Sequence, residues 1–166
     1  MQHSSFDKAI ISDTSCLIAL TKINKLEILR QLYKEIIITP EVVKEYNHPL
    51  PEWFIIKGEK NKALFKEMRE NNFGLGESSS IALAMEIKNS VLILDDDRAR
   101  NFARKKGLSV TGTLTIVGNA CDLGFIDSYE EACEDLRKTN FRFSKKIQED
   151  VKKTLDSGQS RRSSRR

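Results

Sequence analysis

The sequence predicts a three-layer α/β/α sandwich with a central parallel sheet. Short apolar runs alternate along the chain with longer stretches of helical periodicity, the pattern of strand–helix–strand units. The run at 91–94 is apolar at every position, which is typical of a strand covered on both faces. We expect strands at 9–12, 35–38, 53–56, 91–94 and 108–111, with 53–56 either a short third strand or an extended edge.

Helix-start signals fall between these strands. Thr39 is a capping residue type, Pro40 suits the first helical position, and an acid follows near the positive end of the helix. Asn24 with Glu27, and Ser128 with Glu131, have the spacing of capping boxes. Other helices are expected at 61–70, from Glu77 to about residue 87, after 97, from 113 to about 123, at 129–138 and at 144–155.

The length suits one domain, and its charge is unevenly distributed. The tail 157–166 contains four arginines and no acid; the 28 basic residues of the chain less these four leave 24, equal to the 24 acidic residues. We therefore expect a neutral folded domain over 1–156 and a disordered basic Arg/Ser tail over 157–166. Such a tail either binds nucleic acid or an acidic partner, or serves only as a solubilising end.

Cysteine and histidine usage narrows the class of protein. The three cysteines are widely spaced and none forms a C-x-x-C pair, so we expect reduced thiols in a cytoplasmic protein. Two histidines without a Cys/His cluster argue against a zinc site. The chain has neither an apolar run of membrane-spanning length nor a secretory signal pattern at its start, so no membrane partner is expected.

Acidic residues follow the strands where ligands bind in parallel α/β sheets. Asp95, Asp96 and Asp97 come directly after the run 91–94, and Asp13 ends the first predicted strand. The carboxyl ends of parallel strands meet at one edge of a sheet, so these acids are expected to lie close together. Glu45 and Glu77 lie on helices that begin at the same edge. Carboxylate oxygens are preferred ligands of Mg²⁺, and bound cations assist phosphodiester hydrolysis.

Each acid also has a structural interpretation. Asp13 and Asp97 could cap the helices that follow them, and Glu77 could favour a helix start through the macrodipole alone. Glu45 could be a solvated helical charge. Of the three adjacent aspartates, Asp97 is expected to be a helix cap, and the Asp95–Asp96 pair is the better candidate for binding a cation because it follows a strand that is expected to be buried.

Four segments resemble, in order, the motifs of PIN-domain nucleases. The resemblance covers residues 9–126, and the C-terminal helices at 128–156 and the tail lie outside it. The last of the four segments is most similar to a prokaryotic VapC-like subgroup. One departure is Leu94, because many PIN domains have Thr or Ser two positions before the fourth acid. The segments are ISDTSCLIAL (11–20), TPEVVKE (39–45), GESSSIALA (76–84), and LDDDRAR (94–100) followed by GLSVTGTL (107–114).

The resemblance implies a metal-dependent endoribonuclease that leaves a 5′-phosphate and a 3′-hydroxyl. Asp13 and Asp96 would hold Mg²⁺ or Mn²⁺, with Glu45 and Glu77 completing the catalytic set and Asp95 beside them as a further metal ligand. It also implies an RNA substrate, an antitoxin protein as partner and a homodimer. Thr14 and Ser15 would be available to orient the carboxylates.

Three arginines after the acid pair are candidates for substrate contacts, and an alternative function without catalysis also fits the sequence. Arg98, Arg100 and Arg104 follow the acid pair and could hold phosphates beside the cut, or could be a solvated helix face. The rival to an enzyme is a non-catalytic PIN scaffold that binds nucleic acid or protein. A phosphoryl-accepting receiver domain fits less well, because Asp13 stands alone after the first strand.

Overall fold

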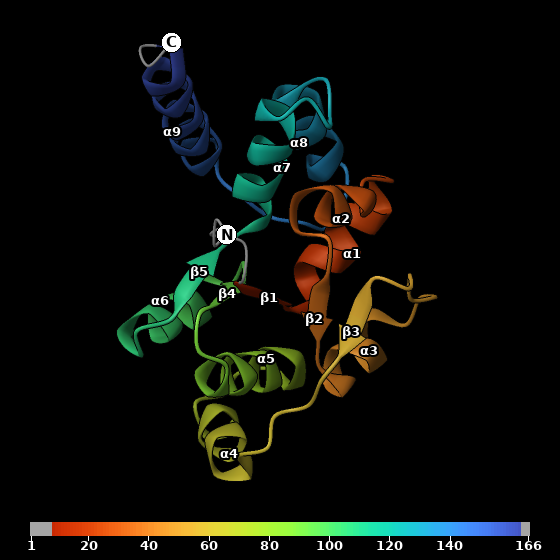
Figure 1. Ribbon diagram of the computed structural model, residues 1–166, viewed down its shortest axis with the longest axis vertical. Coiled ribbons are helices and arrows are strands. Elements are labelled where there is room, and N and C mark those ends of the chain that lie inside the picture. Colours follow the sequence, from red (N-terminus) through yellow and green to blue (C-terminus); the bar gives the residue numbers. More distant parts are fainter. Residues whose placement is uncertain (1–7, 164–166) are drawn as a thin grey trace, which may run out of the picture.

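A five-stranded parallel sheet forms the centre of the described part of the protein (Figure 1). The computed structural model describes residues 8–163, and side chains over 8–158. The strand order is β3-β2-β1-β4-β5, and every neighbouring pair is parallel. The edge position of β3 agrees with the expected short third strand. The strands are β1 (Ala9–Ser12), β2 (Ile36–Ile38), β3 (Phe54–Ile56), β4 (Ser90–Ile93) and β5 (Ser109–Thr111).

Helices cover both faces of this sheet, which confirms the predicted α/β/α sandwich (Figure 1). Successive strand residues point to opposite faces, so Ile10 and Ile93 enter one core, whereas Ile11 and Leu92 enter the other. The helices are α1 (Thr14–Lys22), α2 (Glu27–Tyr33), α3 (Pro40–Tyr46), α4 (Lys62–Glu70), α5 (Leu75–Glu86), α6 (Asp97–Lys105), α7 (Thr113–Asp122), α8 (Tyr129–Arg137) and α9 (Lys145–Ser163).

The two cores belong to different layers. The core that contains Ile10 receives side chains from α1, α2, α3, α7 and α8, including the fully buried Leu17 and Leu29. The core that contains Ile11 receives them from α4, α5 and α6, including Met68 and Ile81. Both layers are held to the sheet mainly by the burial of aliphatic side chains.

Several predicted helix starts are confirmed and others are wrong. Thr39 accepts a hydrogen bond from the Val42 N–H, and Ser128 accepts one from the Glu131 N–H. The Asn24 cap is wrong, because Asn24 has a left-handed φ of 56° and α2 begins only after Leu26. Helix α5 begins at Leu75, two residues before the expected Glu77, with Gly74 at its N-cap.

Helix α9 ends later than the sequence suggested. It was expected to end at residue 155, yet it continues to Ser163, so residues 157–163 belong to the helix. Gln159, Arg161 and Arg162 are good helix formers, whereas Ser157, Gly158 and Ser160 are not, so residue propensity alone does not explain this continuation. The rest of the predicted tail, 164–166, lies outside the described residues, as do residues 1–7.

Helix α9 packs on α7 through a notch at Gly118. A Cβ at Gly118 would lie 2.4 Å from Leu155 Cδ1 and 3.4 Å from Val151 Cγ1. Helix α9 is also bonded to α8, because the Tyr129 hydroxyl donates to the Gln148 carbonyl at 3.0 Å. The absence of a side chain at position 118 therefore sets how closely the two helices approach.

Gly118→Ala is expected to destabilise the protein by about 1–3 kcal/mol, because the added methyl overlaps Leu155 and forces α9 outward. The measurement is the free energy of unfolding in denaturant, with limited proteolysis of α9 as a second readout. Gly158→Ala is the matched control: no atom lies within 4 Å of its Cβ position, and alanine favours a helix. Equal stability of Gly118→Ala and wild type would contradict the tight notch.

Cys16 and Cys133 are buried free thiols, and Cys121 is a partly buried free thiol. Over the residues that were described, no helix combines the length and apolarity needed to cross a membrane.

Candidate active site

The carboxyl edge of the sheet gathers the five predicted acids from four segments of the chain. Asp13 follows β1, Glu45 lies on α3, Glu77 lies in the first turn of α5, and Asp95 and Asp96 connect β4 to α6. Their charges interact: those of Glu77, Glu45 and Asp95 act on Asp13, and that of Asp96 acts on Glu77. The convergence predicted from parallel topology is therefore present.

Asp13 is the most buried of these acids. Only 4% of the residue is exposed, and Oδ1 is buried without a hydrogen-bond partner. Asp13 occupies the N-cap position of α1, but its side chain makes no capping hydrogen bond. Burial raises its pKa to about 8; the Thr14 N–H opposes this rise, and the charges of Glu77, Glu45 and Asp95 add to it. An acceptor oxygen is thus left facing the site.

Glu45 is held in place from two other elements. The Thr14 hydroxyl donates to Oε2 at 2.6 Å, and the Gly76 N–H donates to Oε1 at 2.9 Å. Although the residue is exposed, its carboxylate is therefore not a freely solvated charge. A Cβ at Gly76 would lie 2.4 Å from Glu45 Oε2, 2.8 Å from Thr14 Oγ1 and 3.1 Å from Asp13 Oδ1. Glycine at 76 thus allows α1, α3 and α5 to meet at the site.

Glu77 combines a structural role with a place in the acidic cluster. Its Oε2 accepts the Gly74 N–H at 3.3 Å, across the start of α5. Its pKa is raised chiefly by partial burial and also by the charges of Asp96 and Glu45, whereas the Gly74 N–H and the Arg98 charge lower it.

The three adjacent aspartates have three different environments. Asp95 accepts from the Thr113 N–H at 2.8 Å and from the Thr113 hydroxyl at 2.5 Å, one bond to each oxygen. Burial raises the Asp95 pKa against these bonds and the Arg100 charge. Asp96 Oδ1 accepts the Ala99 N–H at 2.8 Å and caps α6. The expectation that Asp97 is the cap is wrong: Asp97 is already the first helical residue, one position past the cap.

Thr113 is a site residue that sequence reasoning missed. Position 94, where many PIN domains have Thr or Ser, is a fully buried leucine in the core that contains Ile11. The hydroxyl that contacts Asp95 comes instead from the start of α7, eighteen positions along the chain. The available signal was the Gly112-Thr113 step between β5 and α7, which is also a strand end at the same edge.

Some of the carboxylate oxygens at this edge are placed to bind a hard cation, but they do not form a complete site. Within residues 8–158, no three Asp, Glu, His or Cys side chains are close enough to form a ready-made metal site. However, the orphaned Asp13 Oδ1 and the Glu45 carboxylate both line the space beside Gly76. Oxygen donors of this kind suit Mg²⁺ or Mn²⁺, which are also bound through several waters.

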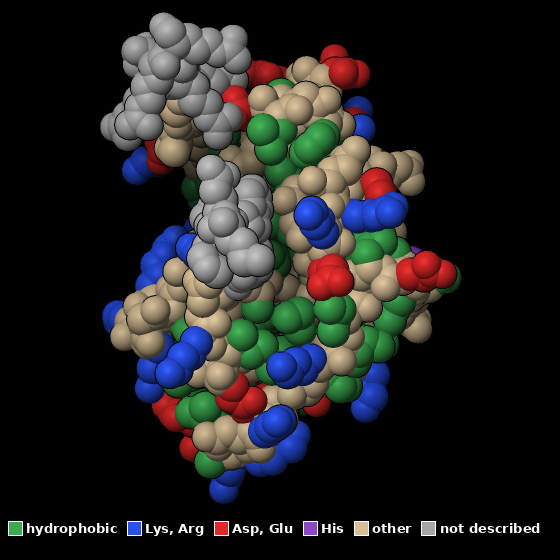
Figure 2. All heavy atoms as spheres, in the orientation of Figure 1, with side chains coloured by type: hydrophobic (Ala, Val, Ile, Leu, Met, Phe, Trp, Pro, Cys, Tyr) green, Lys and Arg blue, Asp and Glu red, His purple; other side chains and the backbone are tan. Residues whose placement is uncertain are grey.

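The predicted substrate arginines differ in how they are held. Arg98 stacks on the Phe73 ring, 4.6 Å from the centroid, and donates to the Asn71 carbonyl. Arg104 is exposed on α6, whereas Arg100 is partly buried. Figure 2 shows Lys and Arg side chains gathered around α6, next to acidic ones.

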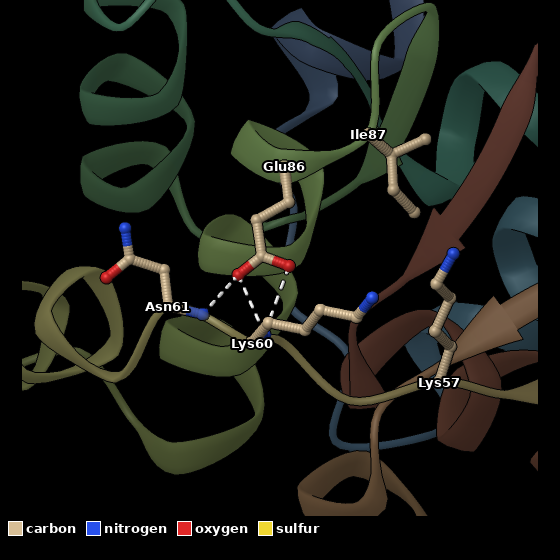
Figure 3. Close-up of a pocket in the computed structure, with 5 residues that line it drawn as sticks. All are labelled: Lys57, Lys60, Asn61, Glu86 and Ile87. Carbon is tan, nitrogen blue, oxygen red and sulfur yellow. Dashed lines mark hydrogen bonds between the residues drawn. The ribbon is translucent and has the colours of Figure 1, made fainter.

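A cavity of about 410 Å³ lies away from these acids (Figure 3). It is lined by Lys57, Lys60, Asn61, Glu86 and Ile87. The Glu86 carboxylate accepts the N–H groups of Lys60 at 2.8 Å and Asn61 at 2.6 Å. Glu77 lies near the start of α5 and Glu86 ends it, so the backbone positions of these two residues are about 13.5 Å apart along the helix axis. The hydrogen bonds to Glu86 anchor the loop before α4. None of the predicted site residues lines this cavity.

A parallel α/β sandwich with carboxylates gathered at the carboxyl edge of its strands is an architecture suited to cation-assisted chemistry. The sequence model of a PIN-domain family matches residues 9–157, so the chain belongs to the PIN-domain family. PIN domains are generally nucleases, and the fold is of that kind. Comparison with curated proteins and with solved structures gave no match.

Proposed function

We propose that this protein is a metal-dependent endoribonuclease. The observation that supports it best is the buried, unpartnered Asp13 Oδ1 beside the Glu45 carboxylate, at the strand edge of a PIN fold. A buried acceptor without a partner is costly, so a ligand that satisfies it is favoured there. The acids around it would repel an RNA backbone unless a cation compensates them.

The proposed roles follow from the contacts. Asp13 and Asp96 would hold Mg²⁺ or Mn²⁺, with Glu45 and Glu77 completing the site and Asp95 as the alternate ligand. When bound, the cation would offset the phosphate charge and lower the pKa of water. Thr14 and the Gly76 N–H orient the Glu45 carboxylate, and Thr113 orients that of Asp95. Glu77 is in contact with the start of α5 through Gly74.

The test is cleavage of end-labelled single-stranded and structured RNA with Mg²⁺ or Mn²⁺, and with a chelator as control. We expect internal cuts that leave 5′-phosphate ends and that stop on chelation. Cleavage that continues undiminished with chelator would contradict the metal dependence.

A non-catalytic binding module is the second candidate, favoured by the hydrogen bonds that already occupy Asp95 and Asp96 oxygens. Such a module would bind RNA or protein without cutting RNA. Calorimetric titration with Mg²⁺ separates the two: an enzyme shows Mg²⁺ affinity that Asp13→Asn removes, and the module shows none.

The VapC-like resemblance extends the proposal to a cytoplasmic toxin of a toxin–antitoxin pair that acts as a homodimer. A basic residue of an antitoxin could pair with the acidic cluster. Growth arrest on expression, relieved by the product of a neighbouring gene, would support this role, and sedimentation would give the oligomeric state. Expression without effect on growth would favour a solitary RNA-processing enzyme.

Thr113→Val is expected to lower the rate of RNA cleavage about 10- to 100-fold, because the isosteric side chain cannot donate to Asp95 Oδ2. The backbone N–H bond to Oδ1 remains, so the fold should be retained. The measurement is kcat with Mg²⁺, together with the Mg²⁺ affinity by calorimetry. Thr113→Ser retains the hydroxyl and should stay within about threefold of wild type; equal activity of the Val and Ser variants would contradict the role of the hydroxyl.

A further inference from the structure

Arg100 has a guanidinium group that the protein itself does not fully satisfy. Its Nε is buried and has no hydrogen-bond partner within the described part of the chain. No ion pair within 4.0 Å joins Arg100 to an acid among the described residues, although Asp95 is near enough for its charge to be felt. A buried cationic donor without a bonded partner is unfavourable in the free protein.

The position of this guanidinium is at the edge of the candidate site. A Cβ at Gly112 would lie 2.8 Å from Arg100 Nη1 and 3.0 Å from Asp95 Oδ1, so both groups lie against the same glycine. The Arg100 side chain therefore reaches from the first turn of α6 to the junction of β5 and α7. Asp95 in turn acts electrostatically on Asp13, the innermost acid of the cluster.

Asp95 does not neutralise Arg100 by direct bonding. Both Asp95 oxygens already accept hydrogen bonds from Thr113, which turns the carboxylate toward the start of α7. Arg98, the neighbouring candidate, is held against Phe73 and Asn71. Arg104 is exposed, so water can satisfy its donors. Among the arginines of α6, Arg100 is thus the one whose guanidinium group lies beside the acids and has a buried Nε without a bonded partner among the described residues.

We propose that Arg100 binds a backbone phosphate of the RNA substrate beside the bond that is cut. The proposal rests on the nuclease function proposed above and extends it by assigning a substrate-contacting residue. A guanidinium group is planar and always charged, and its donors match phosphate oxygens in pairs. The contact also compensates part of the repulsion between a polyanion and the cluster of carboxylates.

The test is the affinity of a fluorescent single-stranded RNA for the full chain carrying Asp13→Asn, which prevents cutting during the measurement. Adding Arg100→Gln should weaken binding about 5- to 50-fold and reduce the slope of log affinity against log salt by about 1. Arg100→Lys retains the charge but loses the paired donors, so it should retain the salt slope with an intermediate affinity. The matched control is Arg142→Gln, an exposed arginine between α8 and α9, which should bind as its parent does.

The outcomes separate this proposal from the nuclease assignment. Cleavage by the chain with Asp13 intact reports on the nuclease, whereas the binding series reports on Arg100. An Arg100→Gln variant that binds RNA as tightly as its parent, with the same salt slope, would overturn the phosphate contact even if the protein cuts RNA. Thermal unfolding of each variant, expected at a temperature no lower than that of its parent, excludes loss of fold as the cause of weaker binding.

Discussion

Asp13→Asn is expected to reduce RNA cleavage about a thousand-fold or more while the protein remains folded. The substitution is nearly isosteric but removes the charge of the most buried carboxylate in the site. Three powers of ten correspond to about 4 kcal/mol of lost transition-state stabilisation, which is the scale of a cation's electrostatic contribution. The measurement is single-turnover cleavage with Mg²⁺. Asp127→Asn, an exposed aspartate before α8, is the matched control and should cut as wild type does.

The same substitution should stabilise the metal-free protein at alkaline pH. The pKa of Asp13 is raised to about 8 in the folded state, so the unfolded chain ionises more readily than the folded one. Stability is then complete below about pH 4 and is lost as the pH rises toward 8, the direction opposite to that of a salt-bridged aspartate. Asparagine does not ionise, so its variant should not lose this stability.

Denaturant unfolding with chelator at a series of pH values measures this difference. We expect the wild-type free energy of unfolding to decrease by a few kcal/mol between about pH 4 and pH 8, with a flatter profile for Asp13→Asn. Parallel profiles for the two proteins would show that Asp13 is not buried in the way described. If Asp13→Asn cuts RNA more slowly but its unfolding free energy depends on pH as that of the wild type does, the catalytic role of Asp13 stands and the raised pKa does not.

Gly76→Ala is expected to lower cleavage about 100-fold without a loss of stability. The new methyl would lie 2.4 Å from Glu45 Oε2 and 3.1 Å from Asp13 Oδ1, so the carboxylates must move apart. The atom in closest contact is the end of a flexible side chain, which can shift at low cost to the fold. Alanine also favours α5 relative to glycine. The damage should therefore fall on kcat and on Mg²⁺ affinity rather than on the unfolding free energy.

Two further variants make this prediction specific. Gly74→Ala is the matched control, since the nearest atom to its Cβ position is Glu77 Oε2 at 4.0 Å. In the Gly76→Ala background, Glu45→Asp shortens the side chain by one methylene and should recover part of the lost activity. Wild-type activity of Gly76→Ala would contradict the close approach of α5 to Glu45.

Local pattern was enough to predict the layers of this fold. The apolar runs that became β1 and β4, and the acids that follow them, are neighbours in sequence, so strand ends and acids coincide whatever else the chain does. Parallel topology then predicted that Asp13 and Asp95 would share one edge. The Thr39 cap was predicted for the same reason, because its partner Val42 is three residues away.

Contacts between distant segments were beyond the reach of local pattern. The Glu45–Gly76 bond joins residues 31 positions apart, and the Asp95–Thr113 bonds join residues 18 apart. The cap of α6 depended on where β4 ends, which placed Asp96 rather than Asp97 at the boundary.

The sequence by itself therefore determined which acids reach the carboxyl edge of the sheet, because strand periodicity and strand ends are local properties. Only the tertiary structure decided the condition of each one. Asp13 retains an unpartnered oxygen, Asp95 accepts hydrogen bonds from Thr113, and the buried Arg100 Nε has no partner among the described residues. The reason is that burial and hydrogen-bond supply come from the helices packed around an acid, and those helices come from other parts of the chain.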